Sequence, residues 1–333
     1  MMTEKLLAEL PPYTQSDDER AIAFSQLGDK LFNELAERMA TQHQYRLLFE
    51  HTLQPELFQQ IKVAAAGYIS ACLNSPIILS EAEMLERLLE ARNNLPNYTG
   101  TGLLMPKKEH TLAFNVFQKS VAEAFYQLGA NDLIDAVDLP VNLRMVYGKT
   151  SPEKMALPFA SSKCHSDVWA GVHADATVVV LPLFGDIDHI TIEAGEMPRE
   201  MELSAMRVMS DFAEGQDVPM VVSYTDAKLR HGTMYFNDAR GLHQTVRRKT
   251  EGLRISVDFR FRRKFNAAYR AMVASTVGGV EADMSVPYEE WLKVGKETLI
   301  VFDETVEQFK QNQRPNAPVP LYTRGYRLVK MFD

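Results

Sequence analysis

Seven short runs rich in β-branched and aromatic residues occupy the middle of the chain and constrain its fold more than any other feature. They span residues 141–147, 177–184, 189–193, 220–224, 232–236, 242–248 and 253–261. Parallel strands need long crossover connections, usually helical, and most of these runs are separated by segments without a helical pattern. The pattern therefore predicts an antiparallel sandwich or barrel rather than a sheet built from βαβ units.

Helical patterns flank this β-rich stretch. In the first third, Ser16 with Glu19 and Ser80 with Glu83 fit capping boxes, and a further helix is expected to begin near Pro55. Helical periodicity returns after residue 264, most clearly over residues 301–313. The helix just before the β-rich stretch is expected to bury a stripe of apolar residues, namely Leu112, Val116, Val121 and Phe125.

These patterns predict a mainly β core with flanking helices, an α+β arrangement in one integrated domain. We expect a helical N-terminal region over residues 1–135, the β core over residues 136–264 and a C-terminal helical extension over residues 265–333. A chain of 333 residues can bury a large core without help from disulfides.

Charge and cysteine content argue against several classes of function. The formal net charge is −8, whereas a surface that binds nucleic acid usually carries positive charge. Cys72 and Cys164 form no C-x-x-C motif, which favours a reducing cytoplasm. The N-terminus does not have the pattern of a signal peptide, and the longest apolar stretch, residues 176–184, is too short to span a bilayer. We expect a cytoplasmic protein without nucleic-acid or membrane partners, and its oligomeric state is left open.

Two histidines and one aspartate are candidates for a shared metal site. His165 and Asp167 stand two positions apart, and in an extended segment such residues point to the same side. His243 lies 76 residues beyond Asp167, so it reaches the pair only if the sheet folds back on itself, as a double-sheet jelly roll does. Two imidazoles and one carboxylate on one face of a metal leave the opposite positions open, which is the facial triad of non-haem Fe(II) oxygenases.

Arg254 and Ser256 follow His243 closely and are candidates for binding an organic acid beside such a metal. If residues 249–252 form a hairpin turn between paired strands, all three side chains share one face. The levels of His243 and Arg254 would be four residues apart along the strand, roughly 13 Å. This separation would suit a short dicarboxylate chelated to the metal. A guanidinium clamps a carboxylate with two hydrogen bonds, and a serine hydroxyl adds a third.

The combined spacing resembles the motif of the Fe(II)/2-oxoglutarate-dependent dioxygenases. The matching residues are His165-x-Asp167, then His243, then Arg254 with ten residues between, and Ser256. The run CHSDVWAG, followed by a strand that ends LPLF, is similar to phytanoyl-CoA-hydroxylase-like oxygenases of carbohydrate and antibiotic gene clusters.

The resemblance covers residues 142–264 and implies a double-stranded β-helix, the cupin-like jelly roll, with helices packed outside. It implies that the two histidines and the aspartate hold Fe(II), and that Arg254 and Ser256 hold the distal carboxylate of 2-oxoglutarate. It implies consumption of O2 and of 2-oxoglutarate, release of succinate and CO2, and oxidation of a small polar molecule, most commonly by hydroxylation. Aspartate at position 167 leaves no room for the halide ligand of related halogenases.

Several residues leave alternatives open. A second H-x-D, His173-Ala-Asp175, could supply the ligand pair, and His231 is a rival for the distal histidine. The basic residues from 247 to 264, Arg260 included, are expected to form the solvated face of a hairpin. Three further residues are candidates for substrate contacts, although each could instead serve packing or a salt bridge: Arg144, Tyr147 and Trp169.

Two other functions fit the same sequence. The first is a cupin-like binding or isomerase protein without oxygen chemistry, in which His165 and His243 are structural or contact the substrate. The second is a helical interaction protein whose first 130 residues bind a partner, with the β core as a scaffold. Metal analysis and oxygen uptake distinguish these classes.

Overall fold

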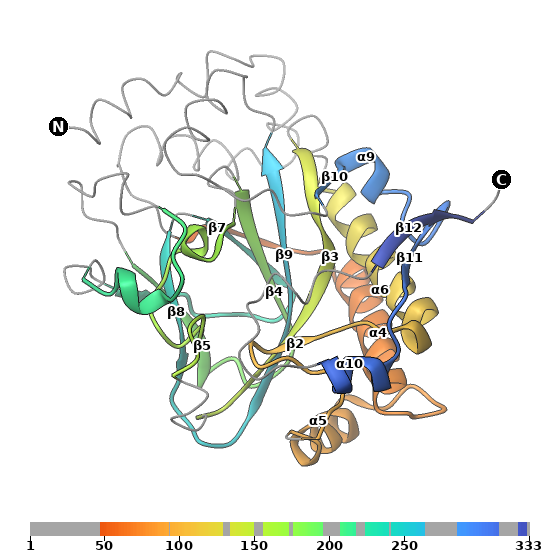
Figure 1. Cartoon of the computed structure of the whole chain (residues 1–333), viewed down its shortest axis with the longest axis horizontal. Coiled ribbons are helices and arrows are strands. Elements are labelled where there is room, and N and C mark those ends of the chain that lie inside the picture. Colours follow the sequence, from red (N-terminus) through yellow and green to blue (C-terminus); the bar gives the residue numbers. More distant parts are fainter. Residues whose placement is uncertain are drawn as a thin grey trace.

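The computed structural model describes residues 47–92, 94–128, 134–149, 156–172, 176–195, 207–217, 224–239, 241–263, 285–312 and 326–331. Figure 1 shows two β-sheets, with helices gathered on the outer side of the larger one. The described helices include none that has both the length and the apolar character required to cross a bilayer.

The larger sheet has seven antiparallel strands. Its order is β1 (Leu47–Thr52), β7 (Thr233–Asp238), β4 (Ala176–Gly185), β9 (Leu253–Arg263), β3 (Ile134–Tyr147) and β10 (Ser285–Pro287), with β2 (Leu103–Leu104) paired to β3. The smaller sheet has the order β6 (Tyr224–Asp226), β5 (Ile190–Gly195) and β8 (Leu242–Arg247). A separate two-stranded antiparallel sheet pairs β11 (Thr298–Phe302) with β12 (Tyr326–Lys330).

Successive strands alternate between the two main sheets. The chain runs from β3 in the large sheet to a bridge at His165 beside β8, and then returns to β4 in the large sheet. It crosses to β5 and β6 in the small sheet, returns to β7 in the large sheet, crosses to β8 and returns to β9. This topology confirms the predicted antiparallel arrangement, because no two neighbouring strands of these sheets run in parallel.

The predicted hairpin between the last two runs is wrong. β8 pairs with β5, with His243 opposite Ala194, whereas β9 pairs with β3 and β4. The connecting residues cross from one sheet to the other, and Gly252 turns the chain with a φ of +115° that favours glycine. Alternation of polar and apolar residues is the same for a hairpin and for two strands in facing sheets, so the sequence pattern did not distinguish them.

The hydrophobic core lies between the large sheet and the helices. Ile255, Val257, Phe259 and Phe261 alternate along β9 and are buried on this side. Phe125 of α6 (Thr111–Tyr126) packs against Phe259 and Phe261 with ring centroids 5.2 and 5.4 Å apart. Full burial of one such side chain contributes about 2 to 3 kcal/mol. The polar residues of β9 consequently face the smaller sheet.

Three helices form where the sequence predicts them: α4 (Pro55–Cys72), α5 (Glu81–Glu90) and α6. The hydroxyl of Ser80 caps α5 by accepting from the backbone N–H of Glu83 at 3.3 Å. The expected apolar stripe of α6 is wrong in part, because Leu112 and Val116 are 75 % and 51 % exposed. Its buried stripe is formed by Phe114, Phe117, Val121 and Phe125.

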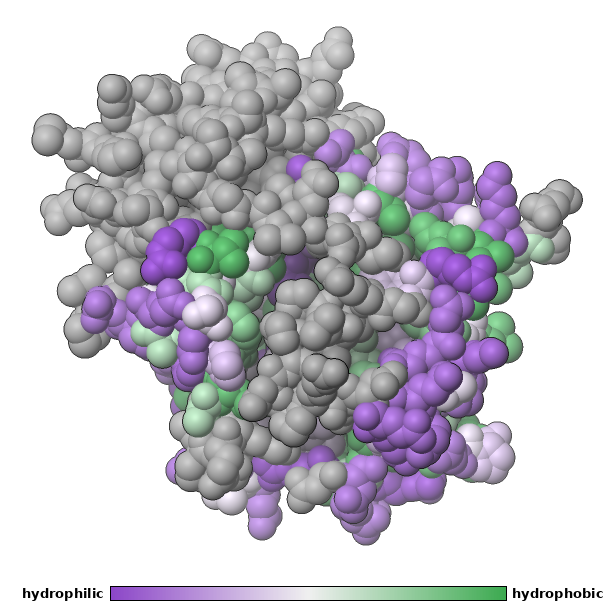
Figure 2. Space-filling model, in the orientation of Figure 1, coloured by the Kyte–Doolittle hydropathy of each residue, from purple (hydrophilic) through white to green (hydrophobic). Residues whose placement is uncertain are grey.

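The ends of the chain contain more strand than expected. β1 lies within the predicted helical region and pairs with β7, and β11 overlaps the helix expected over residues 301–313. Of that helix, α10 (Val306–Asn312) forms, and a short helix α9 (Tyr288–Trp291) precedes β11. Figure 2 shows a predominantly hydrophilic surface over α10 and α5, as expected for helices in contact with water. The helix predicted at Ser16 and Glu19 lies outside the described residues.

Candidate metal centre

Backbone pairing brings His165 beside His243. The two residues form an antiparallel bridge in which each backbone N–H donates to the other residue's carbonyl at 2.9 Å. The N–H of Thr245 also donates to the carbonyl of Ser161 at 2.7 Å, so residues 161–165 lie alongside β8. Asp167 follows at the start of the short helix η3 (Asp167–Ala170), which turns its carboxylate toward both imidazoles.

Three donor atoms converge at this point. Nε2 of His165 lies 3.8 Å, and Nε2 of His243 lies 3.9 Å, from Oδ1 of Asp167. All three donors lie within 4.8 Å of one another. Nitrogen and oxygen donors bind ions such as Zn²⁺ at about 2 Å, so donors that are about 4 Å apart can share one ion. The residues therefore fit a single metal ion.

The other nitrogen of each imidazole faces a backbone carbonyl. Nδ1 of His165 lies 2.7 Å from the carbonyl oxygen of Lys163, and Nδ1 of His243 lies 3.1 Å from that of Gly241. A carbonyl only accepts hydrogen bonds, so each Nδ1 carries the proton and each Nε2 presents a lone pair toward Asp167. The histidines of metal sites are commonly oriented by such bonds.

Burial and charge set the protonation states of this cluster. Burial lowers the pKa of His165 to about 3, so the imidazole is neutral at neutral pH. Burial is the largest single influence on Asp167 and would raise its pKa, but the charge of Arg260, the two histidines and Arg144 together outweigh burial and lower that pKa to about 2. Neutral imidazole and ionised carboxylate are the forms that bind a metal cation.

Arg254 and Ser256 lie on the same inward-facing side of β9. Arg254 is 1 % exposed, and its Nη1 donates to the carbonyl of Ile190 on β5 at 2.9 Å. Among the described residues, neither Nε of Arg254 nor Oγ of Ser256 has a hydrogen-bond partner. Burial lowers the pKa of Arg254 to about 9, and the positive charges of Arg144 and Arg247 contribute. Asp258 opposes this lowering, but among the described residues no carboxylate forms an ion pair with Arg254. A buried cation without a direct ion pair is costly, which points to an anionic ligand.

Arg144 also turns into the space between the sheets. Its Nε forms an ion pair with Asp258, and its Nη1 donates to the carbonyl of Thr101 at 3.1 Å. Arg144 therefore forms a salt bridge, one of the alternatives that the sequence left open, and this salt bridge lies between the sheets. Arg144 lies opposite Ser256 in the pairing of β3 with β9, which places it beside the second candidate residue of the anion site.

The structure does not bring the side chain of Tyr147 to the metal centre. Its hydroxyl donates to the carbonyl of Leu88 at 3.0 Å, on the helix side of the sheet. Trp169 is fully buried and packs closely on Gly215, where an added Cβ would lie 2.6 Å from the indole ring. Phe212, adjacent to Trp169, stacks on the His165 ring with centroids 4.1 Å apart. Trp169 therefore supports the wall behind His165.

Sequence reasoning missed the place of Arg260. Its Nη2 lies 3.5 Å from Oδ2 of Asp167, so it belongs to the site rather than to a solvated face. Arg260 stands an even number of residues after Arg254 and Ser256, so the alternation of a strand places all three on one face. This signal could have identified it. His231 is exposed next to β7, and His173-Ala-Asp175 lies outside the described residues. No sequence signal pointed to Phe212, which reaches His165 from the start of the short 3-10 helix η5 (Phe212–Gly215).

Of the comparisons with known proteins, only the one with solved structures finds matches. No protein-family model matches the chain, and neither does any curated protein. The matching structures include the non-haem α-ketoglutarate-dependent epimerase SnoN from nogalamycin biosynthesis, at 15 % identity and a TM-score of 0.31, over 65 % of this chain and 89 % of that one. They include the carbocyclase SnoK from the same biosynthesis, at 11 % identity and a TM-score of 0.34, over 71 % and 98 %.

A third matching structure is AviO1 from Streptomyces viridochromogenes Tue57, at 11 % identity and a TM-score of 0.38, over 73 % of this chain and 95 % of that one. SnoN and SnoK are both described as non-haem α-ketoglutarate-dependent enzymes. Similarity at this level assigns neither a substrate nor a reaction to this chain.

Proposed function

We propose that this protein is an Fe(II)- and 2-oxoglutarate-dependent oxygenase that oxidises a small molecule and releases succinate and CO2. The observation that carries the proposal is the convergence of the His165, Asp167 and His243 donors within 4.8 Å. The buried, incompletely paired guanidinium of Arg254 in the same interior supports a second, anionic ligand. Hydroxylation is the outcome that we propose for the substrate.

The donor set fits Fe(II). Two imidazoles and one carboxylate occupy one face of an ion and leave the opposite positions for a cosubstrate and O2. When bound, the iron would supply the oxygen chemistry that protein side chains lack. His165 and His243 would hold the ion through Nε2, while the carbonyls of Lys163 and Gly241 fix their rings. The stacked ring of Phe212 would exclude water from one side of His165.

Arg254 and Ser256 fit the distal carboxylate of 2-oxoglutarate. Nη1 of Arg254 is already bonded to Ile190, which orients the guanidinium, and within the described residues the buried Nε is left without a partner and can donate to a ligand. The hydroxyl of Ser256, which has no hydrogen-bond partner among the residues that the structure describes, stands two residues further along the same face of β9. An organic acid bound here would remove the cost of both buried groups, since the guanidinium gains a counter-charge and the hydroxyl gains a partner.

The strand order supports a double-stranded β-helix as the scaffold. In such a jelly roll, strands alternate between two facing sheets, and here the Arg254–Ile190 hydrogen bond joins β9 of the large sheet to β5 of the small one. We propose this fold name for residues 136–264, with the helical regions before and after it packed as parts of the same domain. The site then lies inside the roll, where side chains of both sheets meet.

Succinate formation from 2-oxoglutarate tests the proposal. The wild-type protein, given Fe(II), O2 and a panel of candidate substrates, should form succinate, and one candidate should stimulate it. Asp167→Ala should abolish succinate formation because it removes one metal ligand. Asp188→Ala removes an exposed carboxylate and should retain full activity.

The mass of the product distinguishes the reaction types. A product heavier by one oxygen atom indicates hydroxylation, an unchanged mass indicates epimerisation, and the loss of two hydrogen atoms indicates ring closure or desaturation. A wild-type protein that binds no iron and ignores 2-oxoglutarate would instead favour a cupin-like binding or isomerase protein.

A further inference from the structure

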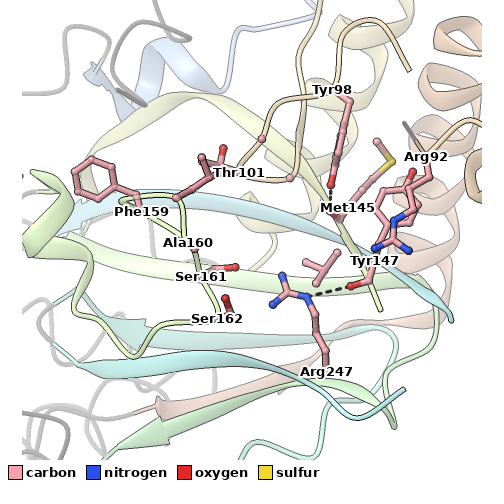
Figure 3. Close-up of a pocket in the computed structure, with 14 residues that line it drawn as sticks. Arg92, Tyr98, Thr101, Met145, Tyr147, Phe159, Ala160, Ser161, Ser162 and Arg247 are labelled. Atoms are coloured by element: carbon pink, nitrogen blue, oxygen red, sulfur yellow. Dashed lines mark hydrogen bonds between the residues drawn. The ribbon is translucent and has the colours of Figure 1, made fainter. Parts of the chain in front are cut away.

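A cavity with two arginines in its wall lies at the edge of β3, separate from the metal centre. Its volume is about 50 Å³, and its walls are loop residues 98–102, the end of β3, residues 157–162 and two arginines (Figure 3). The lining includes none of the three metal donors and neither Arg254 nor Ser256. The cavity is therefore a different site from the one described above.

Two guanidinium groups flank this cavity. Nε of Arg247 donates to the carbonyl of Tyr147 at 3.1 Å, and Figure 3 shows the rest of the group between that residue and the segment that carries Ser161 and Ser162. Arg92 lies 5.1 Å over the ring of Tyr147, and its Nη2 donates to a backbone carbonyl at 3.2 Å. Both arginines thus bond to carbonyls, and the lining contains no acidic side chain within the described ranges.

Positive charge is concentrated around this cavity. Burial lowers the pKa of Arg247, and the nearby charges of Arg144 and Arg92 lower it further. The same three arginines also act on the buried phenol of Tyr98. In the described part of the chain, Asp258 is the carboxylate that pairs with one of them, Arg144. A cavity with low-dielectric walls focuses this excess charge and favours an anion, although the whole chain carries a net charge of −8.

The cavity has the size and polarity for one anionic group. A water molecule needs about 10 to 15 Å³ of such volume, so about 50 Å³ holds roughly four waters, or one phosphate or carboxylate group. The hydroxyl-bearing residues Thr101, Ser161 and Ser162 line it and can donate hydrogen bonds to anionic oxygens. The remainder of a larger ligand would have to extend beyond the cavity.

Hydrogen bonds hold the loop side of the cavity in place. The hydroxyl of Tyr98 donates to the carbonyl of Met145 at 3.0 Å, and the N–H of Met145 donates to the carbonyl of Gly102 at 2.7 Å. Gly102 has a φ of +95°, and an added Cβ would lie 2.9 Å from the Met145 carbonyl. Glycine allows this close approach, so the loop is fixed against β3 before any ligand binds.

The cavity is built on the same two segments that carry the histidines. Arg247 lies four residues beyond His243 on β8, and Ser161 lies four residues before His165. The hydrogen bond from Thr245 to Ser161 keeps these segments together. At about 3.3 Å per residue, four residues of extended chain place the cavity roughly 13 Å from the histidines. One small molecule can span this distance.

We propose that this cavity binds an anionic group, a phosphate or a carboxylate, carried by the substrate, and thereby holds the substrate toward the metal centre. Assigning the anion to the substrate rests on the proposed oxygenase function. Anion binding by Arg92 and Arg247 does not rest on that function, because it needs neither iron nor 2-oxoglutarate.

Calorimetric titration of the metal-free, full-length protein with inorganic phosphate, and separately with acetate, tests anion binding. The wild type should bind at least one of them. Arg247→Gln and Arg92→Gln should each weaken binding about tenfold or more, since each removes a charged hydrogen-bond donor. Lys149→Gln removes the same charge from an exposed side chain beside the cavity and should leave binding unchanged. Thermal unfolding of each variant shows whether it is folded.

A parallel titration with Fe(II) and 2-oxoglutarate without oxygen distinguishes substrate from cosubstrate. Arg247→Gln should bind phosphate or acetate about tenfold or more weakly but should keep cosubstrate binding. The proposal is overturned if the wild type binds neither anion, or if both arginine variants bind as the wild type does. Loss of 2-oxoglutarate binding in Arg247→Gln would also overturn it, because the cavity would then serve the cosubstrate. Failure of the wild type to bind iron and 2-oxoglutarate would contradict the oxygenase function. It would not change the result of the phosphate and acetate titrations, which test anion binding by the cavity.

Discussion

Arg260 and Asp167 form a contact that divides the two oxygens of one carboxylate between different partners. Nη2 of Arg260 lies 3.5 Å from Oδ2 of Asp167, while Oδ1 faces the two imidazoles at 3.8 and 3.9 Å. Arg260 reaches this point from β9 of the large sheet, whereas His243 lies on the small sheet. The guanidinium therefore orients the carboxylate from the opposite side of the site, as outer partners of metal ligands do.

The first prediction concerns this contact in the metal-free protein. Arg260→Gln should raise the pKa of Asp167, because burial is then opposed only by the weaker effects of the two histidines and Arg144. The folded-state pKa of about 2 lies below the unfolded value of 3.8, so the ionised carboxylate stabilises the fold above pH 3.8 and this contribution is lost as pH falls toward 2. At neutral pH the variant should lose on the order of 2 kcal/mol of unfolding free energy.

Denaturant unfolding of wild type and Arg260→Gln across an acid pH series measures this effect. The difference between the two proteins should be largest at neutral pH and should shrink as pH decreases below 3.8. Arg327→Gln, which changes an exposed arginine paired with Asp303, should show no such dependence. A constant difference at every pH would mean that Arg260 does not control the ionisation of Asp167.

The second prediction separates metal binding from cosubstrate binding. Arg254→Met keeps much of the side-chain volume but removes the guanidinium, so 2-oxoglutarate should bind about 10- to 100-fold more weakly. Metal affinity should remain close to the wild-type value, because Arg254 is not one of the converging donors. Calorimetry with each ligand measures both affinities. Wild-type affinity for 2-oxoglutarate in Arg254→Met would assign its carboxylate to another residue.

The third prediction tests the interface that supports the site. Phe125→Ala should cost about 3 to 5 kcal/mol of unfolding free energy because it leaves a cavity against β9. The ring of Phe125 contacts Phe259, Phe261 and Trp291 with centroid separations of 5.2, 5.4 and 5.7 Å. Leu112→Ala on the same helix changes a side chain that is 75 % exposed, so it should cost less than about 0.5 kcal/mol. Equal losses in the two variants would contradict this packing.

The sequence predicts the local elements of the site better than their pairing. Alternation along 253–261 indicates which residues of β9 face inward, and the structure keeps Arg254 and Ser256 on one side of that strand. The i, i+2 spacing of His165 and Asp167 likewise survives, although Asp167 begins a short helix rather than continuing an extended segment. These features depend on a few neighbouring residues, so a local pattern is sufficient to find them.

Features that depend on distant segments could not be predicted. The connection expected to be a hairpin between β8 and β9 is instead a crossover between sheets. The alternation of residues along a strand shows which side chains share a face, but it does not show which strand lies alongside. Phe212 reaches His165 from a segment without periodicity, and β1 joins β7 across more than half of the chain. Arg260 looked like part of a basic surface because its partner, Asp167, lies on a remote segment.

Adding Fe(II) and 2-oxoglutarate to the full-length protein without oxygen, while its visible spectrum is recorded, tests the central claim most directly. The account predicts a weak charge-transfer band in the wild type that requires both additions. The band should be absent in Asp167→Ala and in His243→Ala, and it should appear only at higher 2-oxoglutarate concentration in Arg254→Met. A wild-type protein that gives no band at saturating iron and 2-oxoglutarate would contradict the account.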